Sequence, residues 1–205
     1  MPRKLKWIVL LTVCFTALFM QGQASDNQAT GQVLGGSEKA PVKIEVFSDF
    51  QCPACRELYL NTIVKILQEY PQKDRVRVIY HEFPLKMHKY SRQAARYSEA
   101  ASRLGRQKLL PVMEVLFTDQ AQWGLDGNID ASVSKVLSSE DLKKLKRIME
   151  DSSIDTRIEE ELQLGQTKEI KSTPTLILTY PGKQQKKEGY ISYPIMKQFL
   201  DTILD

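Results

Sequence analysis

The stretch Val42-Lys-Ile-Glu-Val-Phe47-Ser-Asp-Phe-Gln-Cys52-Pro-Ala-Cys55 decides the fold of this 205-residue chain. Apolar residues recur at every second position at its start, which predicts a β-strand over 42–47. The residues from Arg56 to Leu67 favour a helix. Pro53 lacks an N–H and has a fixed φ, so it suits the first position of that helix. The segment predicts a strand, a turn and a helix, with two cysteines where the helix begins.

The two cysteines stand two residues apart, a spacing that lets them close a small disulfide. At a helix N-terminus the first sulfur meets unpaired N–H groups and the positive end of the helix dipole. Both favour the thiolate, so we expect the pKa of Cys52 to lie below the free value of about 8.5. A stabilised thiolate is also a good leaving group, which makes the disulfide easy to reduce. The pattern predicts thiol–disulfide exchange through Cys52 and Cys55, with that disulfide as the redox group and no separate cofactor.

Metal binding is the alternative chemistry for this pair. A zinc site needs two further ligands, and the chain offers one other cysteine, Cys14, and two histidines, His81 and His88, with six residues between them. That separation is outside the usual spacing of about three to five residues. A soft-metal carrier is the remaining alternative, since CxxC thiolates bind Cu(I) or Zn(II). The methionine- or histidine-rich tracts that often accompany such carriers are absent from the sequence, so we expect no metal site.

A basic and then apolar segment opens the chain. Three basic residues precede an apolar run over 7–20 that is shorter than the about 20 residues of a membrane-spanning helix. This layout predicts a signal peptide over 1–24, cleaved after Ala24, and a periplasmic or other extracytoplasmic location. Retention of the leader as an N-terminal membrane anchor is the alternative. Cleavage removes Cys14 and leaves the CxxC pair as the only cysteines, in a compartment where a disulfide can persist.

The formal net charge of +4 depends on the leader. Without residues 1–24 the chain carries 26 basic and 25 acidic residues. This balance gives no electrostatic case for a nucleic-acid partner.

Hydrophobic periodicity and turn residues predict the secondary structure of the rest of the chain. The polar residues 25–40 predict a linker, or a short lead-in strand around Val33-Leu34. Further strands are expected over 76–83 and 173–180 and near 187–190, the last two joined by a turn at Pro181-Gly182. Between them, helical segments run from 91 to about 168 around a loop at 123–128. We therefore expect an α/β fold in which 41–90 and 169–205 form one domain and 91–168 a helical insertion.

Several segments resemble the DsbA-like thiol–disulfide oxidoreductases of the thioredoxin fold. The stretch Phe47-Ser-Asp-Phe-Gln-Cys52-Pro-Ala-Cys55 is similar to their active-site segment, and Phe83-Pro84-Leu85 followed by His88 is similar to the segment after their next strand. The helical block resembles their insertion, and Thr173-Pro174-Thr175 resembles their cis-proline loop. The resemblance covers about 40–205 and implies a thioredoxin fold with an inserted helical subdomain.

The resemblance also implies roles for individual residues. Cys52 is expected to be the nucleophile and Cys55 the resolving thiol. Pro174 is expected to follow a cis bond in a loop that faces the cysteines, with the backbone of Thr173 pairing to the substrate. Glu45 is either an acid beneath the disulfide, which shuttles the proton of Cys55, or a surface glutamate facing the sheet edge.

Asp49 and His88 are expected to have structural roles near the active-site segment. Asp49 is expected to be a turn residue that bonds local backbone, with an influence on Cys52 as the alternative. His88 is expected to be a structural histidine, with a role near the thiolate as the alternative.

Ala54 departs from the resemblance, because the best-known oxidases carry a histidine between the cysteines. Thiolate stabilisation is therefore expected from the helix terminus and backbone donors alone.

The direction of exchange does not follow from these residues alone, because oxidases, reductases and isomerases share them. We expect an exported dithiol oxidase that acts on reduced or misoxidised secreted proteins and is reoxidised by a membrane redox partner. An envelope disulfide reductase or isomerase is the alternative. Related isomerases carry a dimerisation domain, for which the roughly fifteen residues between Ala24 and the first strand leave no room. We therefore expect a monomer.

Overall fold

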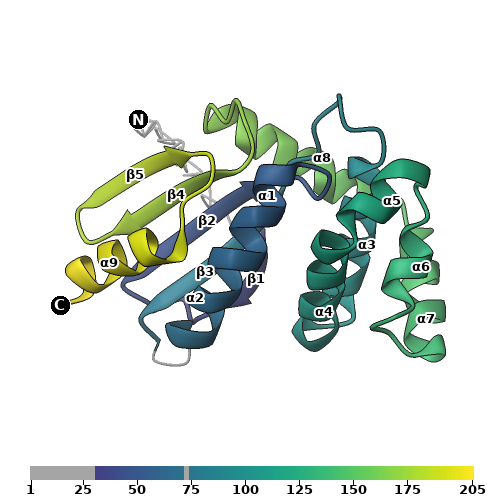
Figure 1. Cartoon of the computed structure of the whole chain (residues 1–205), viewed down its shortest axis with the longest axis horizontal. Helices are drawn as coiled ribbons and strands as arrows, with labels where there is room; N and C mark the ends of the chain where they lie inside the picture. The colour runs from purple at the N-terminus through teal and green to yellow at the C-terminus, as the bar shows by residue number, and fades with distance from the viewer. Residues whose placement is uncertain (1–30, 72–73) are drawn as a thin grey trace, which may run out of the picture.

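The computed structural model describes residues 31–71 and 74–205, in which a five-stranded mixed sheet carries helices on both faces and a helical block at its side (Figure 1). The strand order is β1-β3-β2-β4-β5. Strands β2 and β3 are parallel, and the other neighbouring pairs are antiparallel. The strands are β1 (Gln32–Gly35), β2 (Val42–Ser48), β3 (Val76–Glu82), β4 (Thr175–Tyr180) and β5 (Lys183–Glu188).

Strand β2 lies at the centre of the sheet and leads directly into the cysteine-bearing helix. That helix comprises α1 (Pro53–Leu58), a π-helical turn η1 (Tyr59–Ile63) and α2 (Val64–Glu69). It connects β2 to the parallel strand β3, which confirms the predicted crossover unit. The predicted hairpin is also confirmed, because β4 and β5 pair across a turn in which Gly182 adopts a φ of 72°.

Strand β1 corrects part of the predicted linker. Gln32 and Val33 pair with β3, and Leu34 is fully buried, so these residues form the lead-in strand that was the alternative. The apolar side chain of Leu34 explains this, since burying it against the sheet is favourable. The predicted signal peptide over 1–24, its cleavage after Ala24 and the first part of the linker lie outside the described residues.

The helical block follows β3 and precedes β4. Its middle differs from the sequence prediction, which expected a loop over 123–128. The structure has a helix there because Trp123 is buried and its Nε1 donates to the Leu116 carbonyl at 2.7 Å, and the helix ends at Gly127 with a φ of 79°. The helices of the block are α3 (Ser91–Arg103), α4 (Arg106–Thr118), α5 (Gln120–Asp126), α6 (Ile129–Val133), α7 (Ser139–Met149) and α8 (Ser153–Thr167).

The two faces of the sheet belong to different apolar clusters. The β2 side chains on the same face as Val46 pack with α1, α2 and the C-terminal helix α9 (Tyr193–Leu204). These helices lie in front of the sheet in Figure 1. Phe47 and Phe83 pack behind the sheet against α8. Gly165 of α8 allows this close approach, because a Cβ there would lie 2.2 Å from the Phe83 ring. Successive residues of β2 therefore face separate environments.

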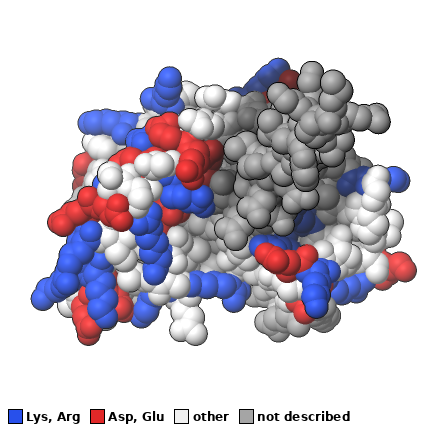
Figure 2. Space-filling view, turned by 180° about the vertical axis from the view of Figure 1, so that it is seen from behind, with Lys and Arg blue, Asp and Glu red and all other residues white. Residues whose placement is uncertain are grey.

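The surface carries charges of both signs. On the face seen from behind, Lys and Arg side chains lie interspersed with Asp and Glu side chains over the part that the described residues form (Figure 2). Within residues 31–71 and 74–205, no helix has the length and apolar character needed to span a membrane.

Candidate active site

The cysteines lie where the sequence places them, at the start of the helix that follows β2. Cys52 is the N-cap residue of α1 with an extended backbone, and Pro53 occupies the first turn. Both cysteines are free thiols. Cys52 has an exposed fraction of 8%, whereas Cys55, one turn further along, is fully buried. Of these two cysteines, Cys52 is therefore the more accessible to another protein.

The two thiols differ strongly in acidity. A hydrogen bond from the Cys55 thiol is the largest influence on Cys52. Together with the Cys55 N–H, the Thr173 side chain and the Ala54 N–H, it outweighs burial and lowers the pKa of Cys52 to about 5. Burial, together with the neighbouring Cys52 sulfur, raises the pKa of Cys55 far above its usual range. At neutral pH the pair is one thiolate, at Cys52, and one fully buried thiol, at Cys55. The expected order is confirmed, but the sequence interpretation missed the largest contributor, which is Cys55 itself.

The cis-proline loop lies directly beside the nucleophile. The Thr173–Pro174 bond is cis, as predicted. In its thiol form Cys52 donates to the Thr173 carbonyl, with a sulfur–oxygen distance of 3.4 Å. Two short hydrogen bonds hold the loop, from Gly189 N–H to the Pro174 carbonyl at 2.7 Å and from Thr175 Oγ1 to the Ser172 carbonyl at 2.7 Å. Thr173, Pro174 and the cysteines are thus brought together.

Glu45 lies on the other face of the sheet. Val46 packs in the cluster that contains Cys55, so Glu45 points behind the sheet, where its carboxylate is 3.1 Å from Lys43 Nζ and 3.5 Å from both Lys168 Nζ and His81 Nε2. Burial raises the pKa of Glu45, but these neighbours outweigh it and lower the pKa to about 2.

The proposed proton shuttle beneath the disulfide is therefore wrong for Glu45. The surface alternative is also wrong, because the residue is only 3% exposed on a central strand. Glu45 forms a buried ion cluster behind the sheet.

Asp49 is the buried carboxylate on the side of the cysteines. Its Oδ1 accepts from Gln51 N–H at 2.7 Å, as expected of a turn residue. Its Oδ2 accepts from Leu85 N–H and from His88 Nδ1, each at 2.8 Å. Its own N–H donates to Cys55 Sγ at 3.4 Å. The sequence interpretation treated Asp49 and His88 separately, although the carboxyl ends of two adjacent parallel strands meet at one edge of a sheet.

Two glutamines tie the active-site turn to the helical block. Gln120 of α5 is buried, and its Nε2 donates to the carbonyls of Phe50 at 2.7 Å and Cys52 at 3.0 Å. Gln51 accepts from Tyr90 N–H at 2.8 Å and donates to the Gly124 carbonyl at 3.4 Å. No local sequence signal indicated these contacts, because they join segments at least 39 residues apart. The insertion therefore helps to position the redox turn.

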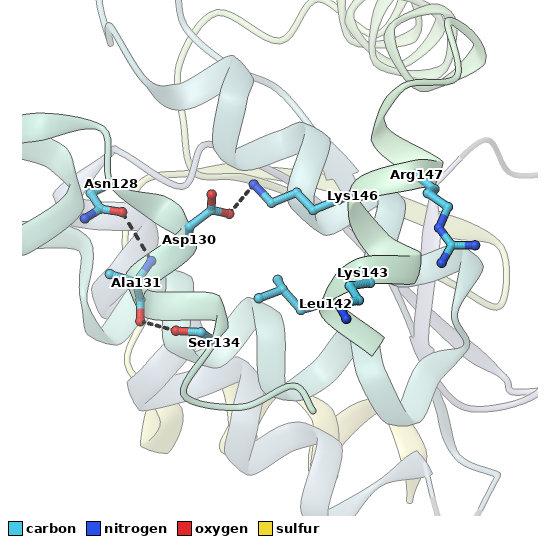
Figure 3. A pocket seen from close by; sticks show the side chains of 8 residues that line it. All are labelled: Asn128, Asp130, Ala131, Ser134, Leu142, Lys143, Lys146 and Arg147. Atoms are coloured by element: carbon cyan, nitrogen blue, oxygen red, sulfur yellow. Dashed lines mark hydrogen bonds and ion pairs between the residues drawn. The ribbon is translucent and has the colours of Figure 1, made fainter. Parts of the chain in front are cut away.

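A pocket of about 580 Å³ lies in the helical block, away from the redox residues just described. Figure 3 shows Lys146 of α7 directed at Asp130 of α6, with which it forms an ion pair, while Lys143 and Arg147 line the same pocket. None of the lining residues belongs to the cysteine site. Among residues 31–71 and 74–205, no group of three His, Cys, Asp or Glu side chains has the arrangement of a metal site.

The chain is similar to known proteins in sequence and in fold. A family model described as thioredoxin matches residues 28–201. Disulfide bond formation protein D of Bacillus subtilis is 26% identical over 183 residues, covering 83% of this chain and 72% of that protein. A probable disulfide bond formation protein D of Bacillus cereus is 23% identical over 145 residues, covering 69% and 67%.

Solved structures agree on the fold. The alpha-DsbA1 protein of Wolbachia pipientis superposes with a TM-score of 0.69 at 18% identity, covering 85% of this chain and 90% of that one. BdbD from Bacillus subtilis in its oxidised form gives a TM-score of 0.66 at 23% identity, covering 85% and 93%. These findings confirm the thioredoxin fold with an inserted helical subdomain and the DsbA-like resemblance. The chain belongs to the thioredoxin family.

Proposed function

We propose that this DsbA-like protein disulfide oxidoreductase is exported and works as a dithiol oxidase through Cys52 and Cys55. The acidity of Cys52 carries the proposal, since its pKa of about 5 lies far below the free value of about 8.5. A stabilised thiolate favours the reduced pair over the disulfide, which makes the disulfide an oxidant.

Oxidation of a substrate proceeds in two exchanges. A substrate thiolate attacks Cys52 Sγ of the enzyme disulfide, an S–S bond forms between them, and Cys55 leaves with the electron pair and takes up a proton. A second substrate thiolate then attacks the substrate sulfur of this mixed disulfide, and Cys52 leaves as a thiolate. The substrate gains one disulfide and the enzyme is left with two free cysteines, the state seen in this structure.

Two exposed apolar residues in the loops that Gln51 contacts support a protein substrate. Met87 and Leu125 are 82% and 84% exposed, and each lies close in sequence to a backbone group that Gln51 contacts, at Tyr90 and Gly124. We propose that reduced or misoxidised secreted proteins bind here, that Thr173 pairs with their backbone, and that a membrane redox partner reoxidises the monomeric enzyme.

The activity is tested with a reduced, unfolded protein that needs disulfides to fold. Catalytic amounts of the oxidised protein should accelerate the formation of its disulfides, and the Cys52→Ser variant should have no effect. Scrambled substrate should be rescued only weakly. Faster rescue of scrambled substrate than oxidation of reduced substrate would indicate an isomerase instead.

Export is tested separately from activity. A basic segment followed by an apolar segment within residues 1–24 supports a cleaved leader. N-terminal sequencing of the protein from an extracytoplasmic fraction should begin at Ser25. A protein that retains Met1 in a membrane fraction would instead support the anchored alternative.

A further inference from the structure

The Asp49 carboxylate makes more contacts than a local turn needs. Its side chain is fully buried, and Oδ1 accounts for the turn by accepting from Gln51 N–H. Oδ2 reaches to the loop after β3, where Leu85 N–H and His88 Nδ1 both donate to it. The turn that carries the cysteines is therefore fastened to that loop through one carboxylate oxygen.

The backbone of the same residue contacts the buried sulfur. Asp49 N–H donates to Cys55 Sγ at 3.4 Å, and this hydrogen bond together with one from Ser48 lowers the pKa of Cys55 against the stronger effect of burial. Because the Asp49 side chain is held at both oxygens, its N–H is held in place as well. His88 is 19% exposed at its side chain and reaches Cys55 only through Asp49.

We propose that His88 is a positioning residue for exchange, which holds the Asp49 N–H on the Cys55 sulfur at the moment when that sulfur carries negative charge. The inference rests on the proposed function, because it concerns the first exchange of that reaction. As an incoming thiolate bonds to Cys52 Sγ, the Cys52–Cys55 bond breaks and the electron pair remains on Cys55. A hydrogen bond to the charged form stabilises it, and a better-stabilised leaving thiolate departs faster.

The loop around His88 supplies a matched control. Lys86 lies two residues earlier in the same loop with an exposed side chain. Removing its side chain changes the charge of the loop without touching the Asp49 contacts. Asparagine at position 88 places an amide nitrogen close to where histidine has Nδ1, so it can still donate to Asp49 Oδ2.

The experiment measures the reduction of the purified oxidised protein by dithiothreitol at constant pH, in the wild type, His88→Ala, His88→Asn and Lys86→Ala. We expect His88→Ala to react about tenfold more slowly, the fold-change of losing a hydrogen bond worth about 1.4 kcal/mol. His88→Asn should recover most of the rate, and Lys86→Ala should stay within about twofold of the wild type. The alkylation rate of Cys52 in the reduced proteins should be unchanged, because His88 acts on Cys55. A general distortion of the active site would instead alter both the reduction rate and the alkylation rate.

Three results would overturn the assignment: an unchanged rate in His88→Ala, an equal fall in Lys86→Ala, or no recovery in His88→Asn. The wild-type reaction reports separately on the proposed function. A wild-type disulfide that does not exchange with thiols contradicts the proposed function, whereas normal wild-type exchange with an unchanged His88→Ala rate contradicts only the role of His88.

Discussion

Val46 and Glu45 are neighbours on one strand, yet they belong to two regions with different chemistry. In front of the sheet, Val46 packs near Cys55, and the thiol pair depends on the helix start and the turn at Asp49. Behind it, Glu45 forms ion pairs with Lys43 and Lys168, and its carboxylate lies 3.5 Å from His81 Nε2. The front region therefore takes its reactivity from a neighbouring thiol, backbone donors and the Thr173 side chain. The buried charges behind the sheet stabilise the fold, and the sheet separates them from the sulfurs.

Replacing either cysteine should have the largest effect on the front region. Cys52→Ser should abolish exchange, because the accessible nucleophile is lost. Cys55→Ser should accumulate mixed disulfides between Cys52 and substrates, because no second sulfur remains to resolve them. Non-reducing gels with mass spectrometry measure both results. Mixed disulfides in Cys52→Ser and none in Cys55→Ser would reverse the assigned roles.

Glu45→Gln should weaken the region behind the sheet and leave the chemistry of the cysteines in front of it unchanged. We expect it to lower the free energy of unfolding by about 3 kcal/mol, since it removes a buried charge from its partners, and to leave the exchange rate unchanged. The pKa of Glu45 is lowered to about 2 from 4.5, so its contribution is present above about pH 4.5 and is lost as the pH falls towards 2. Urea unfolding at pH 7 and pH 3 should show this loss in the wild type and not in the variant. A slower exchange rate in a folded Glu45→Gln protein would contradict the separation.

The pH dependence of alkylation sharpens the comparison of the two sulfurs. Iodoacetamide should label Cys52 of the reduced protein at a rate that is constant above its pKa of about 5 and falls about tenfold for each pH unit below it. Cys55 should stay unlabelled. Glu45→Gln should give the same profile as the wild type. Labelling of Cys55 at mildly acidic pH while Cys52 is spared would be incompatible with the assigned acidities.

Ala54→His should produce the smallest change. A histidine between the cysteines adds one donor near the Cys52 thiolate, so the reduction potential should rise by about 30 mV, equivalent to about 1.4 kcal/mol, while the pKa of Cys52 falls. Ala54→Leu provides the control, because its side chain adds bulk without a donor. A shift of the potential without a shift of the pKa would show that the link between them is incomplete.

Local patterns were sufficient to predict the strand, turn and helix around the cysteines. Alternation along 42–47 and a proline at the first helical position are short-range signals, and both elements are observed. The same alternation shows which residues of a strand share a face, but it cannot show which face the next helix covers. Glu45 was misplaced for that reason. The edge strand β1 was only an alternative, because a four-residue strand has too few positions to show a period.

The rest of the site depends on contacts between distant segments. Asp49 contacts His88, which lies 39 residues further along the chain, and Gln120 contacts the carbonyls of the active-site turn about 70 residues before it. Nothing in the local sequence of α5 indicates that partner, and the helix itself was expected to be partly a loop. Its formation depends on the burial of Trp123, a tertiary effect that local propensity does not contain.

The equilibrium reduction potential of the Cys52–Cys55 pair in glutathione buffers tests the central claim most directly. The Cys52 thiolate is stabilised by Cys55, by backbone donors and by the Thr173 side chain, without a histidine at position 54. The potential should therefore lie between about −270 mV, as in thioredoxin, and about −120 mV, as in the strongest oxidases, and nearer the latter. A value at or below about −270 mV would contradict the oxidase function and indicate a reductase.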